Sequence, residues 1–176
     1  MATTSSNKMP LLVDRPLHSF ASLGATAGLT TASDFNTPNT SLTLLVDCTA
    51  NDGAIIDSIS LISNQASMTS AKVIAFLSVA PTAASVTATN TLAVAFATLG
   101  SSLGDRVNMS LPALCVPVPN LASPAATASA YPSETDKKNT GIYVPSGATL
   151  FVGTSVAITA PAASSRVNVF AQGGFF

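Results

Sequence analysis

The scarcity of helix-favouring charged residues constrains the fold of this chain most. Its 176 residues include one glutamate and four lysines, whereas valine, isoleucine, threonine and serine dominate the segments in which polar and apolar residues alternate. β-Branched residues favour strands, and alternation with a period of two is typical of a strand with one buried face. We therefore expect an all-β fold, an antiparallel β-sandwich of jelly-roll type with an extended N-terminal arm.

The pattern divides the chain into an arm and one domain. Residues 1–40 contain Pro10, Pro16 and Pro38 with little alternation, and we expect them to lie outside the sandwich, so that deleting residues 2–30 would leave the fold intact. Residues 112–139 contain five prolines and predict an extended excursion over the surface. The predicted sandwich, residues 41–176, has strands at 42–48, 54–62, 72–79, 91–97, 106–111, 141–144, 149–158 and 166–172.

Local sequence also predicts how some strands are connected and oriented. The turn Asn51-Asp52-Gly53 between two apolar runs indicates a β-hairpin. Strict alternation in the strand after this turn places Asp57 on an apolar face, where a carboxylate needs a partner, and Arg106 or Arg166 could supply it. In the last strand, Phe170 interrupts an otherwise polar face.

The low charge of the chain excludes several classes of function. Charged residues make up 9% of the sequence, against roughly a quarter in a typical soluble domain. Seven scattered basic residues form no stripe for a phosphate backbone, so we expect no nucleic-acid partner. The N-terminus lacks a secretory pattern, and the uncharged stretch 73–104 contains no run of about 20 strongly apolar residues, so we expect no membrane partner. A weakly charged surface suits assembly with copies of itself or with a partner.

Titratable residues form no convincing catalytic or metal-binding motif. Residues 100–104 match GxSxG, but a strand is expected after Ser102, and His18, the only histidine, precedes the serine. Asp47, Asp52 and Asp57 recur every five residues without the alternate spacing and final glutamate of a calcium loop. We expect no enzyme and no catalytic, cofactor-binding or metal residues, and a hydrolase using Ser102 and His18 is the least favoured alternative.

Two further features leave alternatives open. Cys48 and Cys115 have no CxxC or histidine companions, and buried free thiols are favoured over a disulfide. The terminal Phe175 and Phe176 would be an aggregation hazard if exposed. We expect them to pack either under the sandwich or into a neighbouring subunit.

Four segments, in the same order from residue 51 to the C-terminus, resemble small virion proteins of tailed bacteriophages. They are NDGAIIDSI at 51–59, KVIAFLS at 72–78, VPSGATL at 144–150 with GTS at 153–155, and VNVFAQGGF at 167–175. The resemblance implies a β-sandwich decoration or cement subunit that stabilises a capsid.

From this resemblance and the low charge we expect a non-enzymatic phage protein, made in the host cytoplasm and placed on the capsid surface of the virion. It would form a homo-oligomer, with a trimer favoured, and bridge major capsid proteins through the arm and the excursion at 112–139. The alternative is a receptor- or glycan-binding module of a tail tip or fibre. Because sugar sites usually present aromatic side chains, the absence of tryptophan and the presence of only two tyrosines count against it.

Overall fold

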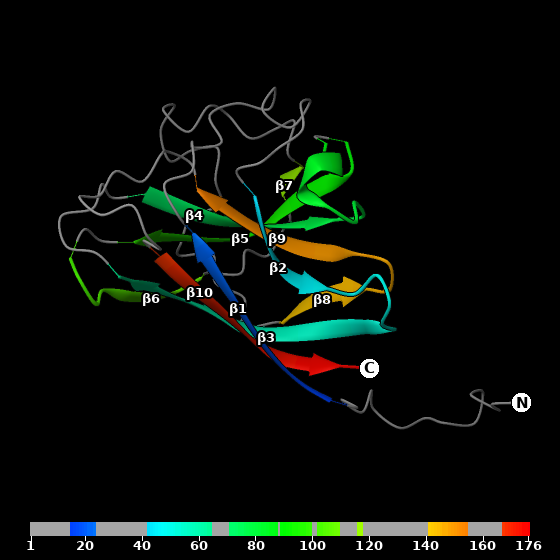
Figure 1. The fold of residues 1–176 in the computed structure, drawn as a ribbon, viewed down its shortest axis with the longest axis horizontal. Helices are drawn as coiled ribbons and strands as arrows, with labels where there is room; N and C mark the ends of the chain where they lie inside the picture. The colour runs from blue at the N-terminus through cyan, green and yellow to red at the C-terminus, as the bar shows by residue number, and fades with distance from the viewer. Residues whose placement is uncertain are drawn as a thin grey trace, which may run out of the picture.

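Two antiparallel β-sheets pack face to face in the computed structural model and confirm the predicted all-β sandwich (Figure 1). The structure describes residues 15–23, 42–64, 71–87, 89–99, 102–109, 116–117, 141–154 and 167–176. Sheet A contains β1 (Arg15–Leu23), β10 (Val167–Phe175) and β3 (Gly53–Ser63), with β6 (Arg106–Asn108) and β8 (Ile142–Pro145) both paired to β3. Sheet B contains, in spatial order, β2 (Thr43–Asp47), β9 (Thr149–Thr154), β4 (Ala71–Ser78), β5 (Thr91–Leu99) and β7 (Val116–Pro117).

The strand pairing is that of a jelly roll. Strands of the first half of the chain pair with strands of the second half in the order β1 with β10, β2 with β9 and β3 with β8, and β4 pairs with β5. These pairs alternate between the two sheets, as expected when one long hairpin is rolled into a sandwich. The jelly-roll type predicted from the sequence is therefore correct.

The hairpin predicted at residues 51–53 is wrong, because this turn joins the two sheets. β2 belongs to sheet B and β3 to sheet A, and the β8–β9 connection crosses beside them. The two crossings are hydrogen-bonded, since Cys48 N–H donates to Ala148 O (3.0 Å) and Gly147 N–H donates to Cys48 O (2.9 Å). Gly53 has φ of 135°, and a Cβ there would lie 2.9 Å from Val144 O, so the glycine serves a tight corner between sheets.

The predicted orientation of Asp57 is also wrong, because a β-bulge changes the alternation in β3. Gln172 pairs with Ser58 and Gly173 with Ile56, which leaves Asp57 without an opposite residue. Ile56 and Ile59 are consequently both buried, while Asp57 is exposed to solvent. Arg106 lies opposite Ile62, about 16 Å along the sheet from Asp57, too far for an ion pair. Arg166 lies outside the described residues.

Residues 15–23 form a strand of the sandwich and not part of an outer arm. β1 pairs with β10 along its whole length and buries Leu17, Ala21 and Leu23 in the core. Pro16 is tolerated because β1 is the outermost strand of sheet A. The prediction that these residues lie outside the sandwich is therefore wrong, and because deleting residues 2–30 would remove this strand, we expect that deletion to destabilise the fold. Residues 1–14 and 24–40 of the predicted arm lie outside the described residues.

The excursion predicted at 112–139 can be compared with the structure at two positions only. Val116 and Pro117 form β7 and pair with β5 at the edge of sheet B, where proline costs no internal hydrogen bond. The uncharged stretch 73–104 contains β4, the 3₁₀ turn η3 (Ala83–Ser85) and β5. In the part of the chain that the structure describes, no helix is long and apolar enough to cross a membrane.

Buried apolar side chains lie on both faces of sheet B, whereas the outward side chains of β1, β10, β3 and β6 in sheet A are half-buried or exposed. The main core between the sheets includes Leu17, Ile59 and Leu150. A second cluster on the outer face of sheet B contains Phe76, Phe96 and Phe151, which are each at most 2% exposed. Other members of this cluster are Leu42, Ile74, Ala80, Val86 and Ala93.

Candidate interaction surface

The register of sheet A aligns its outward side chains in three rows, which we call the sheet A face. The first row is Ser22, Asn168, Ile62 and Arg106; the second is Phe20, Phe170, Ser60 and Asn108; the third is His18, Gln172 and Ser58. Each row crosses the strands from β1 through β10 to β3, and the first two continue to β6. This face has two charged margins and a neutral centre.

An aromatic pair occupies the central row. The ring centroids of Phe20 and Phe170 are 5.1 Å apart with an interplanar angle of 57°. Phe20 is 56% exposed. A phenylalanine side chain usually stabilises a fold by being buried, so this exposure gives up part of that stabilisation. Phe170 is half-buried, so the pair presents one exposed and one half-exposed ring among polar side chains and is a candidate contact point.

Serine–asparagine hydrogen bonds frame the aromatic pair. Ser22 Oγ donates to Asn168 Oδ1 at 2.9 Å in the first row, and Ser60 Oγ donates to Asn108 Oδ1 at 2.8 Å in the second. These neutral bonds order the polar side chains before any partner arrives. A pre-ordered surface loses less side-chain entropy on association.

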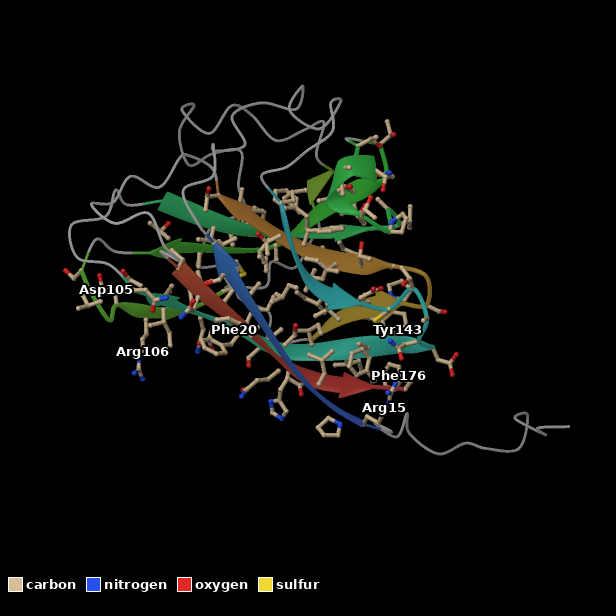
Figure 2. All side chains as sticks on the ribbon, in the orientation of Figure 1. Arg15, Phe20, Asp105, Arg106, Tyr143 and Phe176 are labelled. Atoms are coloured by element: carbon tan, nitrogen blue, oxygen red, sulfur yellow. The ribbon has the colours of Figure 1, made fainter. Side chains whose placement is uncertain are left out.

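Charged groups lie at opposite ends of the sheet A face. Arg106 ends the first row and projects away from the sandwich (Figure 2). Asp57 lies on the bulge beside Ser58, next to the third row, and is also exposed. The central row between them carries no charge.

A small groove separates the edge strands β1 and β2. It has a volume of about 370 Å³ and is lined by Leu17, His18, Ser19, Leu44, Leu45, Val46, Asp47 and Phe175. Ser19 Oγ donates to Leu45 O and joins the two edge strands. The lining of the groove is mostly apolar and includes Asp47.

The carboxylate of Asp47 is held by its own turn. Thr49 donates to Asp47 Oδ1 from Oγ1 (2.6 Å) and from its backbone N–H (2.8 Å). These hydrogen bonds, the one from the side chain foremost, lower the pKa of Asp47 below its ordinary value of 3.8. Asp47 therefore acts as a turn carboxylate, and Asp52 and Asp57 lie apart from it in the corner and on the bulge. Among the described residues no three His, Cys, Asp or Glu side chains are grouped as metal ligands.

The two terminal phenylalanines pack against their own chain, which is the first of the two arrangements considered from the sequence. The guanidinium of Arg15 lies 5.4 Å from the ring centroid of Phe175, and Arg15 Nη2 donates to Asn51 Oδ1 at 2.7 Å. Phe176 N–H donates to Gly53 O (3.1 Å), and its ring lies 6.2 Å from that of Tyr143. Figure 2 shows Arg15, Tyr143 and Phe176 at this end of sheet A.

The structure separates the two residues of the hydrolase alternative. Ser102 lies in a turn beside β3, where its N–H donates to Asp105 Oδ2 (3.0 Å). His18 lies on β1, two strands away and five residues further along the sheet, a separation of about 20 Å. The strand β6 follows the serine turn, so the helix of a nucleophile elbow is not formed there.

Cys48 is a free, fully buried thiol in the first sheet-to-sheet crossing. Burial, with a smaller contribution from the Asp47 carboxylate, raises its pKa, which keeps the thiol protonated and unreactive. Cys115 lies outside the described residues.

Comparison of the chain with protein-family models, curated protein sequences and solved structures finds no match. The sequence identified Phe170 as an exception on a polar face but missed Phe20. The signal for Phe20 was present, since Leu17, Ala21 and Leu23 all lie on the face opposite to it once residues 15–23 are considered as a strand.

Proposed function

We propose that this chain is a non-enzymatic structural subunit of a phage virion, a decoration or cement protein on the capsid surface. It would assemble as a homo-oligomer and stabilise the shell by bridging major capsid proteins. The observation that carries the assembly part of the proposal is the sheet A face, where exposed Phe20 and half-buried Phe170 lie within neutral serine, asparagine and glutamine side chains. We assign this face to homo-oligomer formation and the arm to the capsid contact. A chain with 9% charged residues extends this neutrality over much of its surface.

The physical reason is the cost of desolvation. Ion pairs at an interface must give up water, and this penalty can exceed their attraction. Ser, Asn and Phe side chains can be buried at lower cost, and aromatic residues are enriched in the centres of interfaces. A jelly roll is also an architecture of viral capsid domains, although it serves lectins equally, so the fold is compatible with the proposal without deciding it.

A second candidate is a receptor- or glycan-binding module of a tail. The observation that favours it is Tyr143, which is 53% exposed and lies beside Phe176. Two neighbouring rings could stack on a sugar. Replacement of Tyr143 by serine would abolish glycan binding under this candidate and leave capsid binding unchanged under the first.

The decisive experiment uses phage heads assembled without this protein. Purified protein should co-sediment with these heads at saturable stoichiometry and raise the temperature at which they release DNA. A deletion of residues 2–14, which stops before β1, should keep the unfolding temperature and lose head binding, because we place the capsid contact in the arm. Failure of the full-length protein to bind heads, together with competable hits on a glycan array, would replace the proposal by the second candidate.

A further inference from the structure

The two charged side chains of the sheet A face lie on opposite sides of its central row. Its aromatic pair lies in the central row, and its two opposite charges lie on either side of that row: Arg106 at the first row and Asp57 beside the third. Successive rows are about 7 Å apart, so each charge lies about 7–10 Å from the central row. We propose that this face binds a second copy of the same chain about a two-fold axis that runs along the central row.

The rotation makes specific contacts. A two-fold axis in the plane of the face and perpendicular to the strands places each strand over its own copy and exchanges the first and third rows. Phe20 and Phe170 then stack on the same pair of the partner. Arg106 of each copy comes over the region of Asp57 of the other, one strand spacing (about 4.8 Å) to the side and within reach of an arginine side chain.

Charge complementarity therefore distinguishes a second copy from other occupants. Within one chain Arg106 and Asp57 are about 16 Å apart and cannot pair. In the two-fold arrangement each dimer forms this pair twice. The neutral, hydrogen-bonded middle of the face creates no repulsion between copies.

The available area sets the expected strength. β1 and β10 have nine residues each and β3 has eleven, and β6 and β8 lie end to end along the free edge of β3 with three and four residues. The outward face of these four rows of backbone covers about 500 Å² per copy, so a dimer buries about 1,000 Å² in total. This value is at the lower limit of specific interfaces, and we expect a dimer with a micromolar dissociation constant. Two sheets packed in this way lie about 10 Å apart with their strands within about 30° of each other.

This inference deepens the homo-oligomeric part of the proposed function and rests on it to that extent. It differs from the trimer favoured by the sequence, and sedimentation equilibrium of the full-length protein distinguishes the two. The mass should rise from 17.6 kDa to twice that value across the micromolar range. A monomer at all these concentrations, or a trimer, would overturn the inference, and either species could still bind heads and leave the proposed function standing.

Point variants test the geometry of the interface. Phe20→Ser should weaken dimerisation at least about 30-fold, because it removes the more exposed ring of the aromatic pair from both copies. Leu103→Ser is the matched control, since Leu103 is 66% exposed in the turn before β6 and outside the three rows, and it should leave the dissociation constant unchanged. Thermal unfolding of both variants verifies that they are folded.

A charge exchange gives the sharpest test. Asp57→Arg and Arg106→Asp should each weaken the dimer about tenfold by placing like charges together, and the double variant should recover most of the wild-type affinity. Because the two positions are too distant to interact within one chain, recovery supports the two-fold contact. Additive losses in the double variant would refute it.

Discussion

Replacing Gly173 with alanine should disrupt the centre of sheet A. A Cβ at this position would lie 1.9 Å from Ile55 O, 2.9 Å from Ile55 C and 3.0 Å from Ile56 Cα, and all three atoms belong to the backbone of β3. No side chain can rotate away to relieve these contacts, so β10 must move from β3 by more than about 1 Å. We expect the loss of about three ladder hydrogen bonds at about 1 kcal/mol each, or about 3 kcal/mol in total.

Thermal and urea unfolding measure this loss. A destabilisation of about 3 kcal/mol corresponds to a fall in Tm of about 6–12 °C for a chain of this length. Gly147→Ala is the matched control, because φ of Gly147 is 79° and a Cβ added there would meet no heavy atom within 4 Å. It should cost only about 1–2 kcal/mol, the penalty of a left-handed alanine. If Gly173→Ala were no less stable than Gly147→Ala, the β10–β3 bulge described above would be wrong.

Three further predictions concern the sandwich. Leu17→Ala should lower the free energy of unfolding in urea by about 2–5 kcal/mol, because Leu17 is 1% exposed. His18→Ala, the neighbouring control, should change it by less than about 0.5 kcal/mol, and equal effects of the two variants would contradict the assignment of β1. Thr154→Val should raise the free energy of unfolding by about 1 kcal/mol, since the buried Thr154 Oγ1 has no hydrogen-bond partner among the residues that the structure describes. A loss of stability would show that the hydroxyl is satisfied. Asp47→Asn should remove the stabilisation of the fold by the ionised Asp47 carboxylate. This stabilisation is present above the pKa of Asp47 in the unfolded chain and is lost as the pH falls through its lowered pKa in the folded chain. The stability difference from wild type, under about 1 kcal/mol for so exposed a group, should shrink as the pH falls below about 3.8 and vanish once the pH is below the lowered folded pKa. A difference that grew in acid would refute it.

The fold class and most strands could be predicted from the sequence because alternation reports directly on burial. In β10, Val167, Val169 and Ala171 face the core while Gln172 faces outward, as the pattern predicts. The position of β1 could not be predicted in this way. Its buried residues include a single alanine between two leucines, and Pro16 at its start indicates a strand breaker until the strand is known to lie at a sheet edge.

Connections between sheets depend on interactions that local sequence does not record. Asn51-Asp52-Gly53 is compatible with a hairpin or with a sheet-to-sheet corner, and the choice is made by Ala148 and Val144 from a distant segment. The bulge at Asp57 depends likewise on its partner strand. For the same reason the sequence could indicate a neutral surface but could not place Phe20 beside Phe170, since that contact follows from the register of β1 with β10.

Imaging the intact particle tests most directly the proposed role of this protein as an assembly subunit of a virion head. A low-resolution electron-microscopy map of particles carrying the protein with a C-terminal label should show the label repeated over the outer surface of the head. Label density confined to the tail tip or fibres, or absent from the particle, would contradict the account.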